Sequence, residues 1–86
     1  MDYNIAVITT MSITNKYSIV KRVVRDIEGD WQFLDGNDVS EQNARVVSLQ
    51  DILNLDSSLI EILNIPVGSV AIRDDKNKEW ILGNLK

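Results

Sequence analysis

The chain contains no histidine and no cysteine in its 86 residues. Without histidine it lacks the side chain that most often acts as a general base or metal ligand near neutral pH. Without cysteine it has no thiol nucleophile, no thiolate ligand and no disulfide framework of the kind that stabilises small exported domains. These two absences exclude most classes of enzyme and metal centre, and they make the cytoplasm the expected compartment.

Long apolar runs are also absent. No segment approaches the roughly 20 apolar residues that a membrane-spanning helix needs, and the first residues lack the basic and apolar regions of a signal peptide. The sequence therefore predicts no membrane association. With 44% hydrophobic residues, the composition is that of an ordinary globular protein. We predict one folded domain over residues 1–86, with a thin core that dimerisation would help to cover.

Basic residues are missing from one long stretch of the chain. Residues 26–44 carry six acidic side chains and no lysine or arginine, whereas residues 1–25 sum to +3 and residues 45–86 to −1, within a net charge of −4. Nucleic-acid binding needs a clustered basic face, so this distribution argues against a nucleic-acid partner. The acidic stretch is either an ordinary solvated loop region or a surface that steers a basic protein toward it.

Catalytic and ligand-binding motifs are lacking as well. The thirteen acidic side chains include no pair that the sequence isolates for acid–base catalysis, and the serines are better explained as helix caps. The four glycines are scattered and form no phosphate-binding loop. Asp35 and Asp38 lack the ligand spacing of a calcium loop. We predict no catalytic residue, no metal site and no cofactor, and therefore a protein that is not an enzyme.

The apolar segments that are present predict a small α+β domain. Short runs rich in β-branched and aromatic residues predict strands. They lie at residues 5–9, 31–34, 44–47, 69–73 and 79–82. Residues 17–27 are ambiguous, because their valines and isoleucines have helical spacing but, being β-branched, favour a strand. We predict a strand there, paired with residues 31–34 through the turn at 28–30.

Two helix starts follow one another in the second half of the chain. Ser48 and Asp51 form a capping box that predicts a short helix. A second helix begins at residues 56–58, where the sequence leaves the capping residue undecided, and Pro66 is expected to end it. The predicted fold is a mostly antiparallel sheet of about five strands with two short helices packed on one face.

The two tryptophans have two interpretations. Large aromatic side chains dominate the cores of small sheets, which favours a packing role for Trp31 and Trp80. Tryptophan is also enriched at binding hot spots. Because acidic residues surround Trp31 in the sequence, it is the better candidate for a partner contact.

Four segments, taken in order, carry a family resemblance. They are GDWQF at residues 29–33, GND at 36–38, VSLQDILNLD at 47–56 and ILNIPVGSVAIRD at 62–74. The chain resembles immunity protein family thirty-three over most of its length. Members of that family have a G-W-x-F strand, a Gly-Asp/Asn loop, an L-x-x-I-L-x-x-D helix and a P-x-G-S-x-x-x-R turn and strand. The chain departs from the pattern at Asp30, where members often have glycine, and in a shorter loop before Trp31.

The resemblance implies an α+β protein encoded beside a toxin in bacterial polymorphic toxin systems, which binds and neutralises that toxin without catalysis. The acidic charge adds the expectation of a basic toxin. We therefore predict a non-catalytic binding protein that occludes the surface of a cognate toxin. The predicted partner-binding residues are Glu28, Asp30, Trp31, Asp35, Asp38 and Glu41.

Two alternatives stay open. The first is a homodimeric structural or regulatory accessory domain that pairs through an exposed strand edge. The second is a small-molecule-binding module with a pocket between helices and sheet. No polar constellation in the sequence points to such a ligand.

Overall fold

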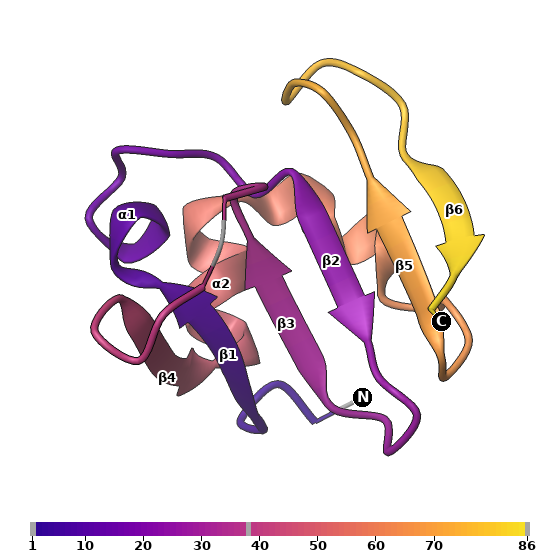
Figure 1. The fold of residues 1–86 in the computed structure, drawn as a ribbon, viewed down its shortest axis with the longest axis horizontal. Helices are drawn as coiled ribbons and strands as arrows, with labels where there is room; N and C mark the ends of the chain where they lie inside the picture. Colours follow the sequence, from indigo (N-terminus) through magenta and orange to yellow (C-terminus); the bar gives the residue numbers. More distant parts are fainter. Residues whose placement is uncertain (1, 38, 86) are drawn as a thin grey trace.

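The computed structural model of the protein describes residues 2–37 and 39–85, and within them six strands form a single sheet (Figure 1). The elements are β1 (Ala6–Thr10), α1 (Met11–Thr14), β2 (Arg22–Arg25), β3 (Trp31–Leu34), β4 (Ala44–Ser48), α2 (Leu49–Leu55), the 3₁₀ helix η1 (Ser57–Ile62), β5 (Ser69–Ile72) and β6 (Ile81–Asn84). The predicted α+β class is confirmed. The sheet has six strands, one in each of the six segments predicted as strands, where the predicted fold counts about five. α1 is an extra helix that is too short for its periodicity to be visible in the sequence.

The strands lie in the order β4-β1-β3-β2-β5-β6 across the sheet. Every neighbouring pair is antiparallel except β1 and β3, which run parallel with Ile8 opposite Gln32. A parallel pair needs a longer connection than a hairpin. Here the chain passes through α1 and β2 before it returns as β3. The sheet is therefore mostly antiparallel, as the sequence predicts.

Hydrogen bonds at the helix starts explain where two of the helices begin. The Asp51 N–H donates to Ser48 Oγ at 3.0 Å and the Ser48 N–H donates to the Asp51 carboxylate at 3.2 Å, which confirms the predicted capping box of α2. Asp56 caps η1, because its carboxylate accepts the Ser58 N–H at 3.0 Å. The structure thus identifies the capping residue that the sequence leaves undecided.

The second helix differs from the prediction at its end. η1 is a 3₁₀ helix and stops at Ile62, before Pro66 is reached. Hydrogen bonds in 3₁₀ helices have poorer geometry, and such helices seldom continue for long even without a proline. Pro66 instead lies exposed in the connection to β5. The expectation that Pro66 ends this helix is wrong.

The core lies between one face of the sheet and the layer formed by α2 and η1, which are drawn behind the sheet in Figure 1. Val23 of β2 and Phe33 of β3 are both 0% exposed. They belong to the same buried cluster as Leu49, Ile52 and Leu59 of the helical layer. Each such side chain contributes about 1.5–3 kcal/mol through burial. The strand predicted within residues 17–27 is confirmed as β2, and Val23 is its core residue.

Candidate partner-binding surfaces

Glu28 and Asp30, two of the predicted partner-binding residues, lie in the turn between β2 and β3. Asp26 organises this turn, because its carboxylate accepts the N–H groups of Glu28 at 2.9 Å and Asp30 at 3.0 Å. Gly29 has a φ of 89°, a left-handed conformation that glycine adopts without strain. Glu28 and Asp30 are both exposed. This end of the sheet therefore presents two acidic groups to solvent.

Asp35 follows β3 at the opposite end of the strand and is half-buried. The Ser12 hydroxyl donates a hydrogen bond to its carboxylate at 2.6 Å, and the Asn37 N–H donates another at 3.0 Å. Burial alone would raise the pKa of Asp35, but these hydrogen bonds favour the charged form and lower the pKa below its ordinary value. Asp35 is therefore ionised at neutral pH and fastens α1 to the end of β3.

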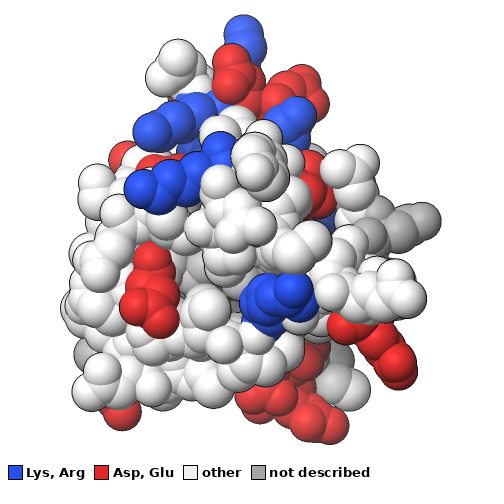
Figure 2. All heavy atoms as spheres, turned by 90° about the vertical axis from the view of Figure 1, so that its left-hand side faces the viewer, with Lys and Arg blue, Asp and Glu red and all other residues white. Residues whose placement is uncertain are grey.

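The predicted acidic set does not form one surface. β3 lies between Asp30 and Asp35, and a strand of that length separates them by about 16 Å. Glu41 is exposed in the connection from β3 to β4, and Asp38 lies outside the described residues. Figure 2 shows the side of the molecule that carries α1 and β4, where acidic side chains stand in separate groups with uncharged surface between them. Residues that are close in the sequence are thus divided between the two ends of the sheet.

Trp31 is a core residue and is only 3% exposed. Its ring stacks on that of Phe33 with the centroids 5.9 Å apart, and the Arg25 guanidinium lies 5.1 Å from its centroid. A ring enclosed in this way offers no surface to a partner. The prediction of Trp31 as a partner-binding anchor is therefore corrected in favour of the packing role.

Asp35 instead lines an open hollow with residues that are distant in the sequence. Tyr17 and Lys21 come from the connection between α1 and β2, and Asp74 and Asp75 come from the β5–β6 loop. These three carboxylates outnumber the one lysine, so the named side chains give the hollow a negative charge. Tyr17 is 84% exposed, and tyrosine is enriched at binding hot spots. The charge pattern of the sequence missed this surface because Asp74 and Asp75 lie far outside the acidic stretch.

Backbone hydrogen bonds hold Tyr17 in its exposed position. The chain leaves α1 through a Schellman motif, in which the Lys16 N–H donates to the Ile13 carbonyl at 3.0 Å and the Tyr17 N–H donates to the Ser12 carbonyl at 2.8 Å. Lys16 has a φ of 66°, a conformation that costs a residue with a side chain roughly 1 kcal/mol. No glycine marks this turn in the sequence. Since Ser12 also bonds to Asp35, the turn and the acidic hollow are held together.

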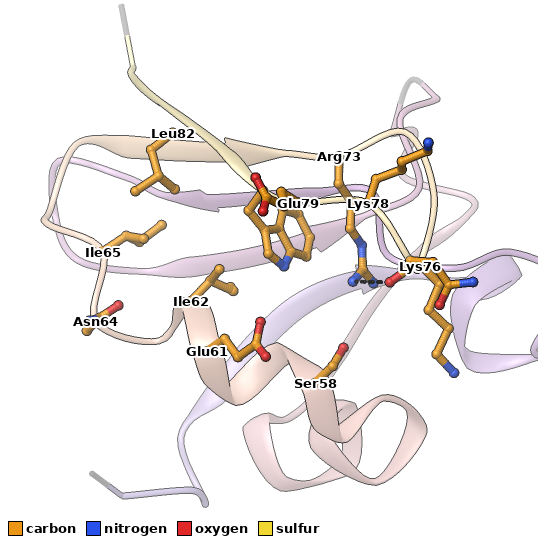
Figure 3. A pocket seen from close by; sticks show the side chains of 12 residues that line it. Ser58, Glu61, Ile62, Asn64, Ile65, Arg73, Lys76, Lys78, Glu79 and Leu82 are labelled. Atoms are coloured by element: carbon orange, nitrogen blue, oxygen red, sulfur yellow. Dashed lines mark hydrogen bonds between the residues drawn. The ribbon is translucent and has the colours of Figure 1, made fainter.

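A cavity of about 440 Å³ lies between η1 and the β5–β6 hairpin (Figure 3). Ile62, Ile65 and Leu82 gather at one end of it, and Lys76 and Lys78 lie at the other. Two glutamates also line the cavity, so its two lysines are matched in charge. The alternative of a small-molecule-binding module therefore gains no charged anchor from this cavity.

Arg73 lies in the wall of this cavity, but its donors are already engaged. Its Nε donates to the Val20 carbonyl at 2.9 Å, and one Nη donates to Asp56 at 2.8 Å in an ion pair whose side chains are 2% and 11% exposed. The guanidinium lies 4.3 Å from the centroid of the Trp80 ring. Burial would raise the pKa of Asp56, but hydrogen bonds from Ser58 and Arg73 outweigh it and lower the pKa. Arg73 therefore connects segments of the fold, and these donors are not available to bind a ligand.

The part of the chain that the structure describes contains no group of three or more Asp and Glu side chains placed to hold a metal ion. Among the same residues, no helix has the length and apolar character needed to cross a membrane.

Comparison with models of protein families assigns the chain to a family. The family model for the Immunity protein Imm33 domain matches residues 6–82, which is nearly the whole chain. The chain belongs to this family. The match confirms the resemblance carried by the four sequence segments, and the arginine of the P-x-G-S-x-x-x-R pattern is the buried Arg73. Comparison with curated proteins and with solved structures gives no significant match. Membership of the Immunity protein Imm33 domain family suggests an immunity role and implies a protein partner.

Proposed function

We propose that this chain is a non-catalytic, cytoplasmic immunity protein that binds a cognate bacterial toxin and neutralises it by covering part of the toxin's surface. The observation that carries the proposal is the family match over residues 6–82. Two features of the surface support a protein partner, namely an exposed tyrosine on a hydrogen-bonded turn and the acidic side chains beside it.

The centre of the proposed binding surface is the hollow beside Tyr17. Carboxylates at the rim of an interface attract a basic partner and speed its association. A tyrosine contributes a large contact area at low cost in side-chain entropy. Because the turn that carries Tyr17 is already hydrogen-bonded, little further ordering is needed on binding. We therefore expect a lysine or arginine of a basic toxin to sit between the carboxylates, with its aliphatic part against the Tyr17 ring.

Glu28 and Asp30, in the turn between β2 and β3, form a competing proposed surface. Glu28 and Asp30 are exposed at the far end of β3 from Asp35, and Glu41 is exposed in the next connection. Glu28 and Asp30 satisfy the same argument from charge, but Trp31, the aromatic residue predicted to contact a partner with them, is buried. Glu41 follows Asp35 in the connection to β4 and lies at the same end of the sheet as the hollow. Asp38 stays a proposed contact on the argument from charge alone. The two ends of the sheet can be tested separately.

Neutralisation is tested by co-expressing the full chain with the toxin encoded beside its gene. We expect growth to be restored, and we expect no rescue from an unrelated acidic protein of similar size. A toxin that remains lethal while the chain is folded and equally abundant would contradict the proposed function.

Two matched pairs of charge reversals locate the surface. One pair is Asp74→Lys with Asp75→Lys at the hollow, and the other is Glu28→Lys with Asp30→Lys at the opposite end; all four positions are exposed. We expect the first pair to slow association with the toxin about tenfold at low salt and to flatten its salt dependence, and the second pair to leave both nearly unchanged. Surface plasmon resonance at several salt concentrations measures this, and the reverse result assigns binding to the β2–β3 turn.

A further inference from the structure

The two edges of the sheet, β4 and β6, differ in what covers their backbone groups. In an antiparallel ladder, alternate residues of an edge strand direct their N–H and C=O groups away from the neighbouring strand. Beside β4, the Leu49 N–H donates to the Ile5 carbonyl, so these two residues form a hydrogen-bonded pair. From that pair, the register shows which residues of β4 bond to β1 and which face outward. It leaves Ala44, Val46 and Ser48 as the outward-facing residues of β4.

Outward groups at both ends of β4 already have partners, and those of Val46 in its middle have none among the described residues. The Ala44 N–H donates to the Ser40 carbonyl at 2.9 Å, and the Ala44 carbonyl accepts the Arg45 guanidinium at 2.8 Å. The Ser48 N–H donates to the Asp51 carboxylate at 3.2 Å in the capping box. Protein sheets avoid unwanted pairing by covering or capping their edges in such ways. The β4 edge is therefore covered at both of its ends.

The β6 edge is open. The Leu85 N–H donates to the Gly68 carbonyl at 2.8 Å, and the same alternation makes Gly83 bond to β5 and leaves Leu82 and Asn84 facing outward. Within the described residues, no group hydrogen-bonds to the outward N–H and C=O groups of Leu82 and Asn84. In Figure 1, no described element lies beyond β6 at this edge of the sheet.

The residues of β6 also lack the features that usually discourage strand pairing. Residues 80–85, WILGNL, contain no charged residue and no proline. All four strand residues are exposed, and Ile81 and Leu82 are 74% and 58% exposed. An exposed, uncharged edge with free backbone groups is suited to binding another strand.

We propose that β6 pairs antiparallel with β6 of a second copy of this chain, with Gly83 on the two-fold axis. In this register, Leu82 of each copy lies opposite Asn84 of the other, so the outward N–H and C=O groups of both residues are satisfied. A two-fold contact uses the same surface twice and must be complementary to itself. The β6 edge meets this condition because no charged residue of the strand faces its own copy.

Gly83 suits the axis because the closest approach occurs there. Residues on the axis form a non-hydrogen-bonded pair whose Cα atoms lie about 4.5 Å apart, and glycine brings no side chain to that point. On the same face, Ile81 lies opposite Leu85 of the second copy, which adds an apolar contact. A pairing of one short strand buries less than the roughly 800 Å² per partner of a standard interface. We therefore expect a dimer whose population depends on concentration.

Sedimentation equilibrium of the full chain tests self-association. We expect the average mass to rise with concentration from that of a monomer toward that of a dimer. Asn84→Pro removes an outward N–H without removing a bond to β5, and it should hold the protein at the monomer mass. Asn84→Ala is the matched control, because it loses the same side chain but keeps the N–H and should still dimerise. Circular dichroism establishes that both variants are folded.

Cysteine crosslinking tests the register, since the chain has no cysteine of its own. A Cβ atom at Gly83 would meet Val70 Cγ1 at 3.7 Å, an ordinary contact, so Gly83→Cys fits the fold. Across the axis the two cysteines lie within disulfide range, and we expect oxidation to convert most of this variant to a covalent dimer. Ile81→Cys is more exposed but would lie about 13 Å from its own copy, so it should crosslink little.

Several outcomes overturn the proposal. One is a monomeric mass at every concentration with no crosslinking of Gly83→Cys. Another is equal crosslinking of the two cysteine variants, which would indicate random collision. A third is self-association that survives Asn84→Pro. If the chain does not self-associate and Asn84→Pro instead abolishes toxin binding, β6 receives a strand of the toxin rather than a second copy. Toxin neutralisation is tested separately by growth rescue and stands or falls independently.

Discussion

Two arginine–tryptophan pairs in this small protein are built in opposite ways. The Arg25 guanidinium lies 5.1 Å from the centroid of Trp31, and the Arg73 guanidinium lies 4.3 Å from that of Trp80. In the first pair the tryptophan is buried and the arginine is half-buried; in the second the arginine is buried and the tryptophan is half-buried. In the first pair the arginine covers a buried tryptophan, and in the second pair the tryptophan covers a buried arginine.

The difference shows what burial of a charge requires. A buried guanidinium is stable only where its charge and its donors are matched. Arg73 meets this requirement through Asp56 and the Val20 carbonyl. Arg25 donates to the Ile65 carbonyl at 2.9 Å, but its Nε has no hydrogen-bond partner among the described residues. Arg73 thus connects separate segments, whereas Arg25 covers a core that Trp31 already fills.

The largest expected effect comes from removing the connecting arginine. Arg73→Met keeps an apolar stem but leaves Asp56 without its counter-ion in a mostly buried site. We expect the free energy of unfolding to fall by about 3–5 kcal/mol. Urea denaturation followed by tryptophan fluorescence measures it. A loss below that of the corresponding change at Arg25 would break the distinction between the two pairs.

Among the tryptophans, the first pair should matter more: we expect substitution of Trp31 to cost more stability than substitution of Trp80. Trp31→Leu leaves a cavity in the core, and we expect it to lower the free energy of unfolding by about 2–3 kcal/mol. Trp80→Leu, at a half-buried ring, should cost about 1 kcal/mol. Thermal unfolding of both variants gives the comparison, and equal losses would mean that the cover of Arg73 is as important as the core residue Trp31.

Acid should weaken the Arg73 connection specifically. Because the pKa of Asp56 is lowered in the folded state from its ordinary value of 3.8, the folded protein binds fewer protons than the unfolded chain. The ionised Asp56 carboxylate therefore stabilises the fold fully at pH values above its ordinary pKa. This stabilisation is lost as the pH falls through the lowered pKa of the folded state. Asp56→Asn should be less stable by about 1–3 kcal/mol at neutral pH and should lose less stability on acidification. Denaturation at several pH values measures both, and an unchanged pH profile would contradict the role of this carboxylate.

The smallest effect is expected at the covering arginine. Arg25→Met loses one hydrogen bond and a cation–π contact but leaves no buried carboxylate unpaired, so we expect a loss of about 1 kcal/mol. Urea denaturation beside Arg73→Met provides the matched comparison. A loss as large as that of Arg73→Met would show that Arg25 also acts as a connection.

Features that depend on neighbouring residues were predictable from the sequence. The capping box joins Ser48 to Asp51, only one helical turn away, and the β2–β3 turn follows from Gly29 and the polar residues around it. The Schellman turn after α1 escaped prediction because a lysine takes the left-handed position where glycine is expected. A local sequence pattern therefore predicts a turn or a cap correctly only where each position holds the residue type that usually occupies it.

The candidate binding surface was predicted only in part. Asp35 belongs to it, but the charge run that selected Asp35 also selected Glu28 and Asp30 at the other end of β3. Proximity in the sequence carries no information about which end of a strand a side chain reaches. Trp31 stood among acidic residues in the sequence and yet packs in the core, because strand residues alternate between the two faces of a sheet.

The sequence by itself determined the α+β class, the family, the capping box of α2 and the lack of histidine and cysteine chemistry. Composition and short-range pattern are enough for these properties. Only the tertiary structure decided the parallel pairing of β1 with β3, the ion pair of Arg73 with Asp56, the meeting of Asp35 with Asp74 and Asp75, and the open β6 edge. Each of these depends on residues far apart in the chain, and many pairings satisfy the same local pattern until packing selects one.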